Sequence, residues 1–404
     1  KVDVGITSKL GRGLHCLHHR QFESLGRRRV AWVRQHHLHI HPRHWSDCPG
    51  SRVANSRGSY NLCLLAGVLQ APHDARALPT SSPPPSHPLD LIRADMQQVD
   101  RVIHERLSSD VPLVREVAQY IISAGGKRLR PALLLMLSGA IGSQNPHRYA
   151  LAAVVEFIHT ATLLHDDVVD ESTLRRGRET ANERFGNAAS VLVGDFLYSR
   201  AFQMMVDVND MRVMQVLSDA TNVIAEGEVL QLMNMHDASI DEAAYLRVIR
   251  SKTAKLFEAS ARLAAILAKA DEATEALCAS YGQALGTAFQ VIDDVLDYEG
   301  SADELGKNLG DDLREGKVTL PIICALRTAS DTQKQLIRQA IEQGDVAHLN
   351  DIRSIILDTG ALQEARASAD AEAQRAIDAA KQLPDNRYSA ALLQLAADLL
   401  GRRS

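Results

Sequence analysis

The sequence predicts an all-α protein: a large single-domain helical bundle preceded by a disordered N-terminal segment. Of the 404 residues, 45% are hydrophobic but only 4% are aromatic, so Ala, Leu, Val and Ile supply most of the apolar surface. This balance favours helix packed on helix over a sheet. From about residue 89 onward, apolar residues recur at i, i+3 and i+4 in one segment after another. We therefore expect one α-domain over residues 86–404.

The first 85 residues have a different character. Residues 1–60 carry 11 Lys and Arg against 3 Asp and Glu, and residues 1–85 contain nine of the sixteen histidines. They show no sustained helical or alternating period and end in a Ser/Pro-rich stretch that is typical of a linker. We expect residues 1–85 to be a disordered leader, either a transit peptide or a translated upstream region foreign to the functional protein.

The periodic segments define the expected helices. The second of them begins at Pro131, whose fixed φ suits a first helical turn. The third and the seventh each carry an acidic cluster among apolar residues. In chain order the expected helices cover residues 111–123, 131–140, 149–170, 188–208, 211–235, 242–268 and 272–298, followed by an Ala-rich helical tail from residue 331 onward.

Charge and cysteine usage exclude several classes of protein. Beyond residue 60 the chain has 34 basic and 47 acidic residues, so this acidic part shows no nucleic-acid footprint. Three of the five cysteines fall in the first 63 residues, and nothing suggests a disulfide framework. No uncharged apolar stretch reaches the roughly 20 residues of a membrane span. We expect a soluble, cytoplasmic protein.

Two DDxxD clusters carry the first chemical signal, at residues 166–170 and 293–297. Asp166 and Asp170 are four residues apart, so on a helix their Cβ atoms share a face at roughly 5–6 Å. The apolar flanks indicate helices that are partly buried, where neighbouring carboxylates repel and take up protons unless a cation joins them. Mg²⁺ binds carboxylate oxygens and shares its remaining sites with phosphates. Two such clusters facing one another predict a diphosphate held through metal ions.

Basic residues supply the second signal. Residues 125–131 read GGKRLRP, two flexible glycines and three cations before a proline. Arg175 and Arg176 follow the first acidic cluster and suit bidentate phosphate contacts. One basic group alone is most often surface charge, but this combination with two acidic clusters predicts a phosphate-binding site.

With these motifs in place, the stretch from about residue 89 to the end resembles the trans-polyprenyl diphosphate synthase family, and within it the bacterial octaprenyl diphosphate synthases. The resemblance covers about four-fifths of the chain. The matching segments are GGKRLRP at 125–131, EFIHTATLLHDDVVDESTLRRG at 156–177, GNAASVLVGDFLYSRAFQMM at 186–205, EGEVLQL at 226–232, SKTAKLFEA at 251–259, GTAFQVIDDVLDY at 286–298 and LGKNLGDDLREGKVTLP at 305–321.

The resemblance implies a role for each group of residues. Two or three Mg²⁺ ions would be held by Asp166, Asp170 and Asp293. Other oxygens of the allylic diphosphate would be bound by Arg175, Lys252 and Lys307. Isopentenyl diphosphate would be bound by Lys127, Arg130, His159 and Arg176. The side facing the allylic cation would be lined by Thr253 and Gln290. The remaining acids are expected to support the metal ligands directly or through water: Asp167, Asp294, Asp297, Asp311 and Asp312.

Small side chains below the first cluster predict a long product. Ala161 lies five residues before Asp166, about 7.5 Å of helix rise. Neither Ala161 nor Thr162 is bulky, whereas short-chain members of the family carry an aromatic residue nearby. Met204 and Met205 are candidates for the floor of the product tunnel, although such a pair is more often ordinary core.

The expected activity is therefore elongation of an allylic diphosphate, farnesyl diphosphate, by successive isopentenyl units to octaprenyl diphosphate for a quinone side chain. We also expect a homodimer, no nucleic-acid partner, and a product that partitions to a membrane. Three alternatives remain: a short-chain farnesyl or geranylgeranyl synthase, the non-catalytic subunit of a heteromeric synthase, and a terpene cyclase.

Overall fold

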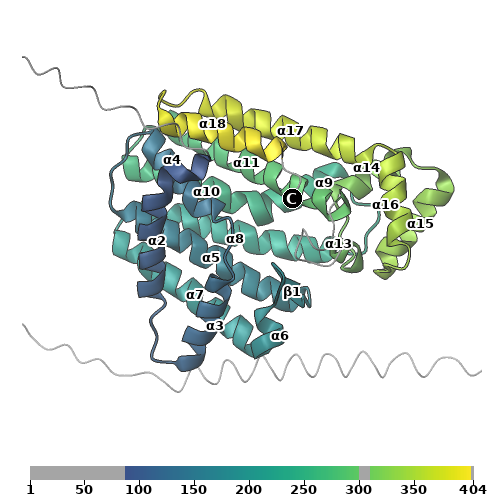
Figure 1. The fold of residues 1–404 in the computed structure, drawn as a ribbon, viewed down its shortest axis with the longest axis horizontal. Coiled ribbons are helices and arrows are strands. Elements are labelled where there is room, and N and C mark those ends of the chain that lie inside the picture. The colour runs from purple at the N-terminus through teal and green to yellow at the C-terminus, as the bar shows by residue number, and fades with distance from the viewer. Residues whose placement is uncertain (1–86, 300–309, 402–404) are drawn as a thin grey trace, which may run out of the picture. The chain divides into compact units, whose positions relative to one another are not determined.

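Helices make up nearly all the regular structure in residues 87–299 and 310–401, the part of the chain that the computed structural model describes (Figure 1). These residues belong to one structural unit, residues 80–404. The elements are η1 (Pro88–Ile92), α2 (Arg93–Arg106), α3 (Pro112–Ser123), α4 (Leu129–Ala140), α5 (His147–Val169), β1 (Leu174–Arg175), β2 (Arg178–Glu179), α6 (Ala181–Phe185), α7 (Asn187–Val208), α8 (Met211–Asn234), α9 (Glu242–Ile249), η2 (Arg250–Ala254), α10 (Lys255–Ala268), α11 (Glu272–Glu299), α13 (Asp311–Arg314), α14 (Leu320–Thr328), α15 (Asp331–Gln343), α16 (Leu349–Asp358), α17 (Ala361–Ala380) and α18 (Arg387–Leu400).

The all-α prediction is confirmed, with two local differences. The helix expected over residues 242–268 is interrupted by η2, a five-residue π-helical segment between α9 and α10. A small antiparallel hairpin, β1 with β2, follows α5 and was not predicted. Its two turn residues, Arg176 and Gly177, both have positive φ, at 54° and 71°. The expected leader, residues 1–85, lies outside the described residues.

Side chains at the helix starts explain several boundaries. Asp210 accepts a hydrogen bond from the backbone of Arg212 at the start of α8. Asp241 caps α9 in the same way, and Asn386 caps α18. Ser330 and Gln333 form a reciprocal capping box at α15. Each such cap satisfies backbone N–H groups that lack partners inside the helix.

The buried apolar residues form two clusters that meet near the site described below. The larger cluster involves α2 to α8, α10, the first half of α11, the second half of α17, and α18. The smaller cluster involves α9, the second half of α11, α13 to α16 and the first half of α17. Helices α11 and α17 pack along one another and cross both clusters (Figure 1). The unit therefore has one continuous helical scaffold, and its two apolar clusters meet at α11.

Several large apolar side chains remain exposed on α7 and α8. On α8, Val229, Leu232 and Met233 recur at helical spacing and are 58%, 57% and 75% exposed. On α7, Leu192 and Val206 are 66% and 63% exposed. None of the helices in the described residues is both long enough and apolar enough to cross a membrane.

Candidate active site

The first acidic cluster lies at the end of α5, where each of its outer carboxylates meets a lysine. Lys252 Nζ lies 3.7 Å from Asp166 Oδ2, and Lys317 Nζ lies 3.0 Å from Asp170 Oδ2. The side chains of the two aspartates are 17% and 12% exposed. Two cations from distant parts of the chain thus lie against the two carboxylates that share a helix face.

Burial raises the pKa of Asp166, as does the neighbouring charge of Asp170, while Lys252 opposes the change. The carboxylate of Glu228 on α8 contacts Lys252 Nζ at 2.6 Å. Burial and the charge of Asp166 raise the pKa of Glu228 to about 7, against the opposing effect of Lys252. The three carboxylates of Asp166, Asp170 and Glu228 therefore outnumber the two lysines beside them, and this excess of negative charge favours a bound cation.

Two glycines let the π-helical segment η2 present Lys252 at this position. A Cβ on Gly227 of α8 would lie 2.8 Å from Ser251 Cβ and 2.9 Å from the backbone nitrogen of Lys252. A Cβ on Gly286 of α11 would lie 2.8 Å from Ala254 Cα. The segment is thus held closely between α8 and α11. Single π-helical turns inside longer helices are frequent at functional sites because they redirect side chains.

Lys317 is positioned by the loop between α13 and α14. The backbone N–H of His236 donates to the Gly316 carbonyl at 2.8 Å, and the His236 ring lies where a Cβ of Gly316 would be. Gly316 has a φ of +69°. Burial alone would lower the pKa of Lys317, but the carboxylates of Asp170, Glu315 and Asp312 together raise it. Lys317 thereby links the first acidic cluster to Asp312.

The second acidic cluster lies on α11, where Asp293 is half-buried and Asp294 is buried. Asp294 accepts hydrogen bonds from Tyr245 Oη at 2.6 Å and from Gln290 Nε2 at 2.7 Å. Thr253 Oγ1 donates to Gln290 Oε1 at 2.9 Å. Burial and the charge of Asp312 raise the pKa of Asp294 to about 8.

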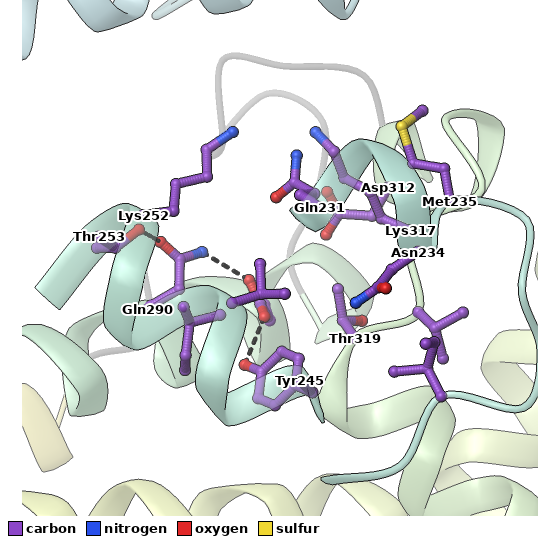
Figure 2. A pocket seen from close by; sticks show the side chains of 15 residues that line it. Gln231, Asn234, Met235, Tyr245, Lys252, Thr253, Gln290, Asp312, Lys317 and Thr319 are labelled. Carbon is purple, nitrogen blue, oxygen red and sulfur yellow. Dashed lines mark hydrogen bonds between the residues drawn. The ribbon is translucent and has the colours of Figure 1, made fainter. Parts of the chain in front are cut away.

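A cavity of about 150 Å³ lies between these groups (Figure 2). Its wall includes Lys252 and Lys317, which contact the first acidic cluster, together with Gln290 and Asp294 of α11. The fold therefore brings the surroundings of both acidic clusters to one space, although they are more than 120 residues apart in the chain.

The donor set fits Mg²⁺ shared with a substrate. Within residues 87–299 and 310–401, no three His, Cys, Asp or Glu side chains form a ready-made metal site. Mg²⁺ is commonly held by one or two carboxylates, with substrate phosphates and water completing its octahedron. Asp166 and Asp170 provide such a pair, and the lysine ammonium groups beside them mark positions where a cation is accommodated.

A separate cluster of basic groups lies around the loop before α4. Gly125 and Gly126 have φ of 72° and 149°, and Arg128 also has a positive φ. A Cβ on Gly126 would lie 2.7 Å from Arg176 Nη1, so the absence of a side chain makes room for that guanidinium. The glycines thus shape the backbone and bring the loop next to the β1–β2 turn.

Arg130 is the most deeply placed of these cations. Its guanidinium lies 4.4 Å from the ring centroid of Phe257, and burial lowers its pKa to about 10. Its Nε atom is buried and has no hydrogen-bond partner among the described residues. A buried donor without a partner, beside other cations, is suited to an anion.

Glu156 and His159, one turn apart on α5, complete this basic cluster. Burial raises the pKa of Glu156, and the charges of Arg128, Arg130 and Arg176 oppose this increase. Burial also lowers the pKa of His159 well below its ordinary value, and the charges of Arg130 and Arg176 lower it further. The imidazole is therefore neutral and can act as a hydrogen-bond donor to a phosphate oxygen without adding charge.

Arg175 adopts a position between the two parts of the site. Its Nε and Nη2 atoms contact Asp167 Oδ1 at 2.8 and 2.6 Å, and Asp167 is fully buried. Asp167 thus fixes Arg175 on β1. Its expected support of the metal ligands stays a prediction. The role of Arg175 toward a phosphate stays a prediction.

The predicted chain-length residues lie in the core on neighbouring helices. Ala161 on α5 is fully buried, and Thr162 donates to the His159 carbonyl at 2.8 Å. Met204 and Met205 on α7 are 1% and 0% exposed. Helices α5 and α7 pack along one another. Their part in setting product length stays a prediction.

Of the remaining predicted residues, Lys127 is exposed before α4. Lys307 lies outside the described residues. Sequence reasoning gave no role to four residues that the structure places in the site: Glu156, Glu228, Tyr245 and Lys317. A charged residue inside the apolar run of α5 is a signal that would have identified Glu156.

Comparison with known proteins agrees with this arrangement. Residues 111–357 match the family model described as polyprenyl synthetase. The chain belongs to the polyprenyl synthetase family. This synthetase is 52% identical over 308 residues to octaprenyl diphosphate synthase of Escherichia coli (strain K12). The matched residues cover 76% of this chain and 95% of that protein. It is 46% identical over 312 residues to an all-trans-nonaprenyl-diphosphate synthase of Rhodobacter capsulatus, covering 77% and 96%.

Solved structures show the same fold as this synthetase. A polyprenyl synthase from Caulobacter crescentus CB15, complexed with calcium and isoprenyl diphosphate, matches with a TM-score of 0.76 and 45% identity, covering 78% of this chain and 97% of that one. A decaprenyl diphosphate synthase from Rhodobacter capsulatus matches with a TM-score of 0.74 and 45% identity, covering 78% and 98%. The predicted family and enzyme class, a prenyltransferase, are confirmed.

Proposed function

We propose that this synthetase condenses farnesyl diphosphate with successive isopentenyl diphosphates to octaprenyl diphosphate, the precursor of a quinone side chain. The prediction of long-chain, all-trans elongation is confirmed by curated relatives at about 50% identity. Octaprenyl synthases of Escherichia coli and Haemophilus influenzae are 52% and 50% identical to this chain. These values favour the octaprenyl product over the nonaprenyl one, whose synthase is 46% identical.

One structural observation supports two diphosphate subsites most directly. The acid-and-lysine cluster at the end of α5 and the arginine-and-histidine cluster around the loop before α4 each have a member on α5, where His159 and Asp166 are seven residues apart. Seven residues are close to two helical turns, so the two side chains share a face. The allylic diphosphate would bind at the first cluster and isopentenyl diphosphate at the second.

The chain's own charged and polar groups explain where each substrate would bind. Lys252 and Lys317 lie against Asp166 and Asp170, and both ammonium groups would be available to phosphate oxygens if these carboxylates held Mg²⁺. Neutral His159 donates to the second diphosphate, and Arg130 and Arg176 supply its counter-charge. Asp166, Asp170 and Asp293 would hold two or three Mg²⁺ ions, whose positive charge would stabilise the departing diphosphate. The likeness to a synthase complexed with calcium supports a metal site.

The homodimer is the second part of the proposal. The exposed apolar stripe of α8, with Leu192 and Val206 of α7, is the kind of patch that a partner covers in soluble oligomers. We assign catalysis to residues 86–404 and infer that the apolar product partitions to a membrane. The cytoplasmic location of the enzyme stays a prediction.

Diphosphate release by the purified full chain tests the activity. With Mg²⁺ and both substrates we expect diphosphate release that EDTA abolishes. Asp166→Asn and Asp293→Asn should each lower the rate of release by at least about 100-fold, because each removes a ligand of the metal ions whose charge would stabilise the leaving group. Asp370→Asn, on the exposed side of α17, is the matched control and should retain full activity. No release by the unmodified chain alone would instead support the non-catalytic subunit.

A further inference from the structure

A chain of three hydrogen bonds lines the cavity wall beside Lys252 (Figure 2). Thr253 Oγ1 donates to Gln290 Oε1, and Gln290 Nε2 donates to Asp294 Oδ1. Tyr245 Oη donates to the other carboxylate oxygen, Oδ2 of Asp294. The four residues come from three elements, α9, η2 and α11, so the bonded chain is a property of the fold rather than of one helix.

Asp294 is the member of this chain that decides which end of the Gln290 amide faces Thr253, a neighbouring residue of the cavity wall. A hydroxyl can donate or accept, so neither Thr253 nor Tyr245 alone distinguishes the amide oxygen from the amide nitrogen. A carboxylate only accepts when it is ionised, and it therefore requires the NH₂ group on its side.

The consequence is electrostatic. With the NH₂ group held by Asp294, the carbonyl oxygen of Gln290 lies on the side of Thr253, and both residues line the cavity. That oxygen is the negative end of the amide dipole, whereas the NH₂ group is the positive end. A fixed dipole aimed at developing charge stabilises a transition state at no cost in reorganisation.

We propose that Asp294, oriented by Tyr245, is a positioning residue that holds the carbonyl oxygen of Gln290 toward the positive charge developing on the allylic carbon. The inference rests on the proposed function, because only an allylic diphosphate that loses its leaving group develops this charge. Neither Asp294 nor Tyr245 needs to touch the substrate. Both act through Gln290.

Asp294→Asn provides the sharpest test because it can keep every hydrogen bond while reversing their direction. Tyr245 is buried, and within the described residues Asp294 is the acceptor of its hydroxyl, so the hydroxyl would keep donating, now to the oxygen of the introduced amide. The nitrogen of that amide would then donate to Gln290 Oε1. The Gln290 NH₂ group would then donate to Thr253 and face the cavity. We expect kcat for the first condensation to fall about tenfold or more, with KM for both substrates within about twofold and Tm nearly unchanged.

The double variant Asp294→Asn with Gln290→Glu restores an oxygen on the cavity side. The carboxylate introduced by Gln290→Glu would accept both from Thr253 and from the amide introduced by Asp294→Asn. The kcat of the double variant should therefore recover at least about threefold relative to Asp294→Asn alone. A cycle in the Gln290→Leu background separates this effect from the loss of a charge beside Asp293. If Asp294 acts through the amide, Asp294→Asn should change kcat in that background by less than about twofold.

Tyr281→Phe is the structural control, since Tyr281 is equally buried and donates to the Leu392 carbonyl away from the cavity. It should lower Tm without lowering kcat. The proposal is overturned if Asp294→Asn has the kcat of the unmodified enzyme, or if its effect persists undiminished in the Gln290→Leu background. Failure of the unmodified enzyme to elongate any substrate would contradict the proposed function instead.

Discussion

The imidazole of His159 is neutral because of where α5 places it. Burial and three arginines lower its pKa well below the ordinary value of 6.5. The unfolded chain regains the ordinary pKa, so it takes up a proton below about pH 6.5 that the folded chain does not. The free energy of unfolding should therefore be fully expressed above that pH and should fall as the pH decreases through it, by up to about 1.4 kcal/mol per pH unit.

Thermal unfolding of His159→Gln at pH 8 and pH 5.5 checks this prediction. The unmodified protein should lose more Tm over this interval than the variant, because glutamine does not titrate. His104→Gln, at an exposed position on α2, should keep the slope of the unmodified protein. An identical pH slope in His159→Gln and the unmodified protein would show that the histidine does not carry the predicted linkage.

Sequence patterns predicted individual residues well where spacing within one helix sets the geometry. The Asp166 and Asp170 pair and the position of His159 follow from a four-residue and a seven-residue interval on α5. Lys317 was missed because its contact with Asp170 joins residues 147 positions apart. No local pattern encodes such a contact. It depends on Gly316 and His236, which fix a loop rather than a helix face.

The loop before α4 depends on backbone shape as much as on charge. Gly126 combines a φ of +149° with a close approach to Arg176. Gly126→Ala should therefore displace that guanidinium and raise KM for isopentenyl diphosphate by about tenfold, a loss of about 1.4 kcal/mol of binding. The backbone strain should also lower stability by about 1–3 kcal/mol.

Gly142→Ala separates strain from contact. Gly142 also has a positive φ, +74°, but a Cβ there would meet nothing within 4 Å. Steady-state kinetics of the two variants should show an unchanged KM in Gly142→Ala despite a comparable drop in Tm. An unchanged KM in Gly126→Ala would mean that Arg176 does not bind the second diphosphate.

Helix prediction succeeded where the apolar period is long and unbroken, and six of the seven bounded segments correspond to single observed helices within a few residues. It failed at η2, because a π-helical turn adds one residue to a turn without changing the apolar composition. The hairpin β1–β2 was also missed. Its strands have only two residues each, too few for an alternating pattern, and its turn requires a positive φ at Arg176.

The arrangement of these elements explains where the site lies. The two apolar clusters meet across α11, and η2 and Gln290 lie at that boundary. Chain topology of this kind was predicted only through the family resemblance. Composition and periodicity gave the fold class but not the order in which helices pack.

The exposed apolar stripe on α8 predicts association of two chains. Leu232→Glu should shift the protein from dimer to monomer in size-exclusion chromatography with light scattering, because a buried unpaired carboxylate is costly at an interface. Leu357→Glu is the matched control, since Leu357 is 54% exposed on α16, close to the 57% of Leu232. A Leu232→Glu protein that remains dimeric would place the interface elsewhere.

The length of the product depends on the metal site, the second diphosphate site and the tunnel together, so one measurement tests all three. The measurement is chain-length analysis of the product that the full chain and residues 86–404 make from farnesyl diphosphate and isopentenyl diphosphate with Mg²⁺. Octaprenyl diphosphate is expected from both, and Ala161→Phe should shorten it, because the ring would fill the space about 7.5 Å below Asp166. Elongation by the unmodified chain that stops at geranylgeranyl diphosphate, or an unshortened product from Ala161→Phe, would contradict the account.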